Sequence, residues 1–319
     1  MKLSAKSISK YIYGVVDTNI ENGYLRLNRF TPEQIAVVYA KSEFCGIRTE
    51  ETALVKFIAK TDATNIEVEY KFELISSLDT IECYVDGKLI EIKYVKDLAP
   101  VNKKGKVSFN LPQGEKEVKI LFPCDATILL KSVTVNGYIK KAKTKKCKVL
   151  WSGDSITQGW GSFRAGETYT EIAGEILSYD TLNQGIGGYV YDADLVSKID
   201  GYTPDKIIIA YGTNHYLAEN FETEVEKYYV KLDQIFHGIP VLVITPIWRK
   251  ESDQNLARLV EVGKIIQKIT SKYPNIMVVD GFDLIPNLPE YFMDGLHPNA
   301  LGMRVYGYEL ARKIKEIKF

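Results

Sequence analysis

The chain has 319 residues, of which 45% are apolar and 26% charged, values typical of a globular protein. Its 41 Lys and Arg residues balance 41 Asp and Glu residues, so the formal net charge is zero. A neutral chain lacks the positive surface of a nucleic-acid or anionic-membrane binder, and no apolar run is long enough to span a bilayer. We therefore expect neither a nucleic-acid nor a membrane partner.

Two further features bound the class of protein. Residues 1–7 are partly basic but have no apolar segment after them, so they do not resemble a signal peptide. We expect a cytoplasmic location for the chain as given, and secretion if a signal was trimmed. The four cysteines lie far apart without C-x-x-C spacing, which is typical of buried thiols in a reducing compartment rather than a zinc site. No metal or cofactor is expected.

From about Gly23 to Ile139 the sequence predicts short strands separated by turns, with no long helical period between them. In Ile66–Ile75, apolar and charged residues alternate with the period of two of a half-buried strand. Many short strands at even spacing favour a jelly-roll-like β-sandwich. The predicted strands are Tyr24–Phe30, Ile35–Ala40, Ala53–Lys60, Ile66–Ile75, Ile81–Val85, Leu89–Val95, Lys106–Leu111, Glu117–Phe122 and Thr127–Val135.

The function of this first half stays open at the level of sequence. It contains no histidine and no cluster of Cys or paired acids on a shared face. It is either a packing domain or a module that binds carbohydrate or shapes the substrate site, because a fold alone does not define a function. The basic run 140–148 predicts a solvated linker, and we place the boundary there, with domains at 1–145 and 146–319.

After residue 148, strands alternate with helices, which predicts a five-stranded parallel sheet with helices on both faces. The run Ile207–Ala210 is apolar throughout, as in a strand buried on both faces. The predicted strands are Lys148–Ser152, Asp180–Asn183, Lys206–Tyr211, Pro240–Ile244 and Ile276–Val279, and the predicted helices are Glu167–Leu177, Asp192–Ile199, Phe221–His237, Asn255–Ser271 and Ala300–Ile317.

The candidate nucleophile is Ser155, which follows the first of these strands. Ligands of open α/β sheets bind at the carboxyl ends of the strands, and a serine hydroxyl there needs a base within reach. His297 lies in a loop three residues after Asp294. One tight turn can place that carboxylate against one imidazole nitrogen and leave the other nitrogen for the serine, which is the arrangement of a catalytic triad.

Acyl transfer also requires hydrogen-bond donors for the oxyanion that develops in the transition state. Suitable donors are the backbone N–H of Ser155, the N–H of Gly188 and the side-chain amide of Asn214. Gly188 and Asn214 follow two other predicted strands, so both are expected at the same edge of the sheet.

Four blocks of sequence together resemble the SGNH, or GDSL-type, hydrolase superfamily. They are residues 153–157 (GDSIT), 183–188 (NQGIGG), 212–214 (GTN) and 294–299 (DGLHPN). Each block alone is weak, but four in this order are specific, and the resemblance covers about residue 148 to the end. It implies a three-layer α/β/α, flavodoxin-like domain and metal-free ester hydrolysis. By position it assigns Ser155 as nucleophile, Gly188 and Asn214 as oxyanion donors, and Asp294 and His297 as the rest of the triad.

A β-sandwich before such a domain is similar to two-domain carbohydrate acetylesterases. The chain departs from many members of the superfamily at His215, where they have an acid. His215 lines the pocket or fills a loop, and Trp160, Tyr189 and Trp248 either stack on a sugar ring or form ordinary rim packing. Trp151, inside the first strand, is expected in the core.

The sequence thus predicts a serine esterase that acts on short-chain esters, above all acetyl esters, of a saccharide. Short acyl groups are favoured because the loops are brief and no long apolar lid is present. The alternatives are a thioesterase or lysophospholipase, and a carbohydrate-binding protein without turnover.

Overall fold

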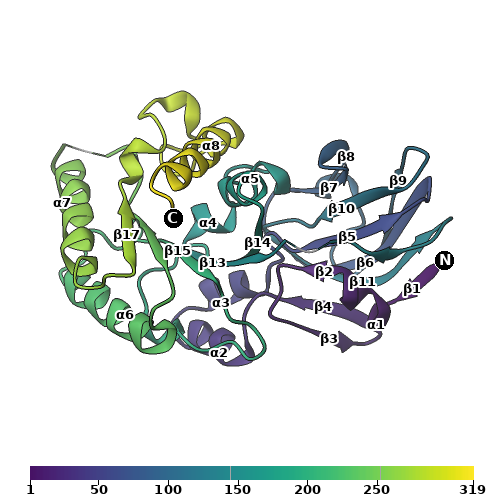
Figure 1. Cartoon of the computed structure of the whole chain (residues 1–319), viewed down its shortest axis with the longest axis horizontal. Coiled ribbons are helices and arrows are strands. Elements are labelled where there is room, and N and C mark those ends of the chain that lie inside the picture. Colours follow the sequence, from purple (N-terminus) through teal and green to yellow (C-terminus); the bar gives the residue numbers. More distant parts are fainter. Residues whose placement is uncertain (144, 252) are drawn as a thin grey trace.

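The computed structural model describes residues 1–143, 145–251 and 253–319, so Thr144 of the predicted linker lies outside the described residues. An N-terminal β-sandwich lies beside a C-terminal parallel sheet that is covered by helices (Figure 1). The predicted fold class, an α/β domain preceded by an all-β sandwich, is confirmed.

Two antiparallel sheets face each other in the N-terminal part. Inward-facing side chains of both sheets, such as Phe72 and Phe57, belong to one buried cluster. The first sheet has the order β3-β4-β11-β6-β9, with β1 paired to β11: β1 Lys2–Ser4, β3 Asp17–Glu21, β4 Tyr24–Asn28, β6 Asn65–Ile75, β9 Lys104–Asn110 and β11 Ala126–Val135. The second has the order β12-β5-β10-β7-β8, with β2 paired to β5: β2 Ile12–Tyr13, β5 Lys56–Thr61, β7 Thr80–Val85, β8 Lys88–Tyr94, β10 Lys116–Leu121 and β12 Lys140–Lys141.

The strand predicted at Ile35–Ala40 is wrong, because this segment is helical. Helix α2 (Pro32–Lys41) begins with a capping box, in which the Thr31 hydroxyl accepts the Gln34 N–H at 3.3 Å and the Gln34 side chain accepts the Thr31 N–H at 3.0 Å. The Ser42 side chain then caps helix α3 (Glu43–Glu50). These caps and Pro32 at the first helical position outweigh the β propensity of the Val-Val-Tyr run.

Five parallel strands form the C-terminal sheet in the order β14-β13-β15-β16-β17. Successive residues of a strand face opposite sides, so Ile207 and Ile209 pack toward α6 and α7 while Ile208 packs toward α5 and α8. The elements are β13 Cys147–Gly153, α4 Ser155–Gln158, α5 Tyr169–Ile176, β14 Tyr179–Gly185, β15 Lys206–Ala210, α6 Phe221–Phe236, β16 Val241–Ile244, α7 Asp253–Thr270, β17 Ile276–Val279 and α8 Ala300–Glu316. Short helix α1 (Ala5–Ile8) precedes them, and single 3₁₀ turns lie at 9–11, 95–97, 165–167, 193–195, 281–283 and 289–291.

The helix predicted at Asp192–Ile199 is also wrong, since only Ala193–Leu195 form a 3₁₀ turn. The Asp192 carboxylate accepts the Asp194 N–H at 3.0 Å and binds the Lys41 ammonium of α2 at 2.6 Å. The chain leaves the helical conformation at Val196, where φ is −74° and ψ is 105°, and Ile199 pairs with Tyr202 in an antiparallel bridge that requires extended backbone.

Helices α2 and α3 belong to the N-terminal half of the sequence but pack on the C-terminal sheet (Figure 1). Val38 of α2 and Cys45 of α3 are buried in the same cluster as Leu182 and Ile186. The two halves of the chain therefore share part of one core.

A buried ion cluster also joins the sandwich to α5. Glu171 lies 2.7 Å from the ammonium groups of both Lys56 (β5) and Lys119 (β10), and Lys119 also contacts Glu175 at 2.9 Å. Lys56, Lys119 and Glu171 are buried. Burial alone would raise the pKa of Glu171, but the two ammonium groups lower it below its ordinary value.

No helix of the described residues is long and apolar enough to cross a membrane.

The E171A variant should lose about 3–5 kcal/mol of unfolding free energy in urea denaturation at neutral pH, because the buried ammonium group of Lys56 loses its acidic partner and that of Lys119 keeps only Glu175. Since the folded-state pKa of Glu171 is lowered, its contribution is full above the unfolded value of about 4.3 and is lost as the pH falls further. The E309A variant, which removes one of the two acids that contact the exposed Arg312, is the control and should keep the wild-type midpoint. Equal midpoints for both variants would contradict the stabilising role of the cluster.

Candidate active site

Ser155 lies at a sharp turn between β13 and α4. Gly153 ends the strand, and a Cβ there would lie 2.1 Å from the Thr157 hydroxyl and 2.7 Å from the Ala210 carbonyl, so only glycine fits. The buried Asp154 caps α4 through the Ile156 N–H at 3.0 Å, and burial raises its pKa to about 7. This turn leaves the Ser155 hydroxyl at the carboxyl end of β13, the strand between β14 and β15.

The structure brings Ser155, His297 and Asp294 into a hydrogen-bonded series. The Ser155 Oγ lies 2.9 Å from His297 Nε2, and His297 Nδ1 lies 2.8 Å from Asp294 Oδ2. The other carboxylate oxygen accepts the N–H groups of Leu296 at 2.9 Å and His297 at 2.8 Å. Because a carboxylate only accepts hydrogen bonds, it selects the tautomer with a proton on Nδ1 and leaves Nε2 free to accept from Ser155.

The charge of Asp294 is stabilised by the same contacts. Partial burial alone would raise its pKa, but the hydrogen bonds from the His297 backbone, the His297 side chain and the Leu296 backbone lower it. Asp294 is therefore ionised at neutral pH, as an orienting group for the imidazole requires.

Gly188 and Asn214, the predicted oxyanion donors, line one pocket together with Ser155. Gly188 has a φ of +78°, and a Cβ there would lie 3.2 Å from the ring of Phe44. The Asn214 amide donates to the Tyr189 carbonyl at 2.8 Å, and this bond uses only one of its two N–H groups. Their catalytic roles stay predictions.

The pocket has a volume of about 430 Å³ and is open to solvent. Three of its residues come from the sandwich half of the chain, which the sequence did not indicate. The lining residues are Phe44, Arg48, Asp125, Ser155, Gln158, Trp160, Gly187, Gly188, Asn214, Asp294, Leu296 and His297.

Of the four predicted substrate-contacting residues, Trp160 lines the pocket, with its ring 6.2 Å from that of His297. Tyr189 does not line the pocket, because its side chain is buried and its hydroxyl donates to Asp192. Trp248 does not line it either, since its ring stacks on Phe282 at 4.1 Å and its indole N–H donates to the Phe282 carbonyl at 3.0 Å.

His215 also lies away from the pocket. Its ring packs 4.8 Å from that of Phe221 and 5.9 Å from that of Tyr191, and neither ring nitrogen has a hydrogen-bond partner among the described residues. Burial lowers its pKa to about 4, so the imidazole is neutral at physiological pH. It lies half-buried in a loop against these aromatic rings, so the second of the two alternatives for this position, that it fills a loop, agrees with the structure. Trp151 is buried in the core as expected.

The residues that sequence reasoning missed are Phe44, Arg48, Asp125, Gln158 and Leu296. Phe44 and Arg48 lie on α3. The Ser42 cap of this helix is a sequence signal from which the helix could have been predicted. Gln158 and Leu296 lie beside or inside two of the four motif blocks, at positions the motifs leave unspecified. Asp125 has no local signal, because only the fold brings it to the pocket. No group of three or more His, Cys, Asp or Glu side chains is arranged to hold a metal ion within residues 1–143, 145–251 and 253–319.

Residues 152–305 match the model of the GDSL-like Lipase/Acylhydrolase family. No curated protein sequence matches the chain at a significant level. The match over these residues, together with the fold, indicates the class of protein, a GDSL-like acyl hydrolase.

Solved structures resemble both halves of the chain at once. A salicylyl-acyltransferase from a tetracycline biosynthetic pathway has a TM-score of 0.80 at 16% identity, covering 100% of this chain and 97% of that one. An acetyl xylan esterase from the rumen bacterium Butyrivibrio proteoclasticus has a TM-score of 0.69 at 13% identity, covering 100% and 99%. A family two carbohydrate esterase from Cellvibrio japonicus has a TM-score of 0.67 at 17% identity, covering 99% and 97%. At these identities the likeness shows a shared two-domain fold.

Two tryptophans provide a matched test of the pocket. The W160L variant should lower kcat/KM for para-nitrophenyl acetate by roughly tenfold, equivalent to about 1.4 kcal/mol, because a ring beside His297 is lost from the pocket wall. The W248L variant should reduce thermal stability, because a ring stack and a hydrogen bond are lost, and leave kcat/KM unchanged. The reverse pattern in steady-state kinetics and thermal melts would place the substrate beside Trp248.

Proposed function

We propose that the protein is a serine esterase that hydrolyses short acyl esters, in particular acetyl esters of carbohydrates. The observation that carries this proposal is the contact of Ser155 Oγ with His297 Nε2 at 2.9 Å, with Asp294 behind the imidazole at 2.8 Å. Nucleophile, base and orienting acid are thus in hydrogen-bonding order at the edge of an accessible pocket.

In the proposed mechanism Ser155 Oγ attacks the ester carbonyl carbon while His297 Nε2 takes the hydroxyl proton. The oxyanion of the tetrahedral intermediate accepts hydrogen bonds from the N–H groups of Ser155 and Gly188 and from the Asn214 amide. Collapse breaks the carbon–oxygen bond to the alcohol, which leaves with the proton from His297. Water then loses a proton to His297 and attacks the acyl-enzyme, and a second collapse releases the carboxylic acid and restores the Ser155 hydroxyl.

The pocket supports a small polar substrate. Its volume of about 430 Å³ lies toward the lower end of the usual range for small-molecule sites, roughly 300–1,000 Å³. Trp160 and Phe44 offer apolar faces on which a sugar ring can stack, and Arg48 and Asp125 offer polar groups within the same wall. Two of the structural neighbours described above are named as carbohydrate or acetyl xylan esterases.

Two alternatives from the sequence are addressed by the same geometry. A carbohydrate-binding protein without turnover would not need a serine, an imidazole and a carboxylate in hydrogen-bonding order. A thioesterase or lysophospholipase would use the same three residues but needs room for a long acyl chain. Phe44 lies against Gly188 and limits the space beside the proposed oxyanion site.

Substitutions in the triad should show a graded loss of kcat on para-nitrophenyl acetate. S155A and H297A should each lose roughly 10⁶-fold, because nucleophile or base is absent, and D294N should lose roughly 10⁴-fold, because the imidazole remains. All three should keep the wild-type circular dichroism spectrum. Undiminished hydrolysis by S155A would remove Ser155 from its role. A D294N variant that keeps the wild-type kcat would mean that another group orients the histidine.

A substrate panel tests the finer proposal. Acetylated xylan, acetylated mannan and free acetylated sugars should release acetate, and kcat/KM on aryl esters should fall by roughly tenfold or more from acetyl to octanoyl, because Phe44 restricts the pocket. Acyl thioesters and lysophospholipids should be poor substrates, and S155A should be inactive on the whole panel. Preference for a lysophospholipid or a long-chain thioester would contradict the carbohydrate acetylesterase assignment and keep the serine mechanism.

A further inference from the structure

A hydrogen bond links the nucleophile turn to the loop that carries Gly188. The Gln158 side-chain oxygen accepts the Gly187 N–H at 2.7 Å, and both residues are buried. Gln158 is the last residue of α4, the helix that Ser155 begins, and Gly187 directly precedes Gly188. One side chain therefore spans the two segments that supply the proposed oxyanion donors Ser155 and Gly188.

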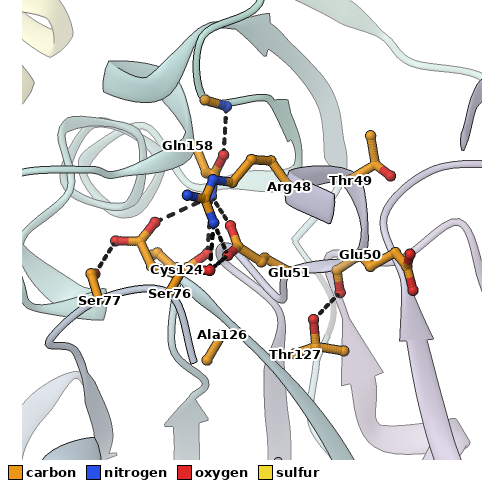
Figure 2. Close-up of polar contacts among 12 residues, drawn as sticks. Arg48, Thr49, Glu50, Glu51, Ser76, Ser77, Cys124, Ala126, Thr127 and Gln158 are labelled. Carbon is orange, nitrogen blue, oxygen red and sulfur yellow. Dashed lines mark hydrogen bonds and ion pairs between the residues drawn. The ribbon is translucent and has the colours of Figure 1, made fainter. Parts of the chain in front are cut away.

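The amide of Gln158 can adopt only one orientation. Its Nε2 donates to Glu51 Oε2, to Asp125 Oδ1 at 3.2 Å and more weakly to the Cys124 carbonyl at 3.4 Å (Figure 2). A carboxylate only accepts hydrogen bonds and a backbone N–H only donates. If the amide were rotated by half a turn, its oxygen would face carboxylate oxygens and its NH₂ group would face the Gly187 N–H. Both ends of the amide would then lose their hydrogen bonds.

Both acids come from the sandwich half of the chain. Glu51 follows α3, is fully buried, and is held by Arg48 Nη1 at 2.8 Å and by the Ser76 hydroxyl (Figure 2). Asp125 lies between β10 and β11 and accepts the Ser77 hydroxyl at 2.8 Å. The orientation of Gln158 is thus imposed by side chains that are themselves fixed by the sandwich.

The loop has few other supports near Gly187. The Ile186 N–H donates to the Gly153 carbonyl at 2.9 Å, the Tyr189 N–H closes a turn onto the Ile186 carbonyl at 3.1 Å, and Asn214 holds the Tyr189 carbonyl at 2.8 Å. Within this turn, the Gln158 contact is the side-chain hydrogen bond that fixes the Gly187 backbone among the described residues. A displacement of the Gly188 N–H would weaken its bond to the oxyanion, which forms fully only in the transition state.

We propose that Gln158 is a positioning residue for the oxyanion loop, oriented by Glu51 and Asp125 so that it holds the peptide before Gly188. This inference rests on the serine esterase function proposed above. It makes the sandwich part of the catalytic geometry, because two of its carboxyl groups determine how the amide of Gln158 points.

The groups around this amide carry several charges. Glu51, Asp125 and Asp79 are the acids, and Arg48 and Arg29 are the facing cations; Asp79 accepts the backbone N–H of Asp125 at 3.1 Å. Burial raises the pKa of Glu51 to about 7 and raises that of Asp125 and Asp79. A further carboxylate at position 158 would therefore face like charges and bind a proton readily.

The first test is the Q158L variant, which keeps the approximate volume and removes both ends of the amide. We expect kcat on para-nitrophenyl acetate to fall by roughly 10- to 100-fold with KM changed by less than about twofold, because only the transition state needs the aligned N–H. The matched control is Q34L, which removes a buried glutamine bonded to Gln184 and the Leu195 carbonyl. Q34L should lose stability in thermal melts and keep the wild-type kcat.

The second test is the Q158E variant, which separates positioning from folding. When protonated, the introduced carboxyl group can accept from Gly187 and donate to an acid, as the amide does; when ionised, it repels both acids. The kcat of each variant is divided by that of wild type at the same pH, which cancels the pH dependence that the enzymes share. On this scale, Q158E should exceed Q158L at about pH 6 and lose this advantage toward about pH 9.

The outcomes are distinct. A kcat for Q158L equal to that of wild type overturns the inference. If Q158L does not fold, the Q158E variant provides the test. The inference is also overturned if Q158E is inactive at every pH, or if both variants fold and Q158E is no more active than Q158L. An active wild type with an inactive S155A variant verifies the esterase in the same assay. Failure of wild type to hydrolyse any ester of the panel would instead reject the esterase, and this inference with it.

Discussion

The hydrogen bonds of the buried Arg29 guanidinium join the sandwich half of the chain to the edge of the parallel sheet where the candidate active site lies. The nitrogens of this guanidinium donate to the carbonyls of Arg48 at 2.8 Å and Glu51 at 2.5 Å on one side, and to those of Asn183 at 2.6 Å and Gly185 at 3.1 Å on the other. Burial lowers its pKa to about 10, so it is still a cation at neutral pH. A buried cation is costly unless its donors are satisfied, so this contact favours one arrangement of the end of α3 against the end of β14.

This arrangement explains why the sandwich is more than a neighbouring domain. Its helix α3 places Phe44 and Arg48 in the pocket wall, and Arg48 stacks over the Phe44 ring with 4.7 Å between guanidinium and ring centre. Packing and shaping of the site were alternative interpretations of this half of the chain. In the structure the same short segment does both, because α2 and α3 complete the core on one face of the parallel sheet and Phe44 lies beside Gly188.

The sequence predicts the elements whose pattern is local. Strands such as β6 and β15 follow from alternation or from a continuous apolar run, and the order of βα units predicts the sheet edge at which Ser155, Asp294 and His297 meet. Two elements were mispredicted because a local contact outweighed the pattern. The capping box at Thr31 makes a helix of β-forming residues, and the pairing of Ile199 with Tyr202 follows an extended backbone at Val196. The wall formed by Arg48 and Asp125 could not be predicted, since the side chains that enclose a pocket are defined by packing between remote segments.

The identity of residue 158 follows from the charges around it. The Gln158 side chain faces two buried acids, Glu51 and Asp125, on one side and the Gly187 N–H on the other. A side-chain amide supplies two N–H groups that these two acids can accept and an oxygen for Gly187, and it adds no charge. A carboxylate would add a further acid beside these two, and a lysine could not accept from Gly187. The choice of glutamine three residues after the proposed nucleophile therefore depends on the buried acids of the sandwich half as much as on the motif that it follows.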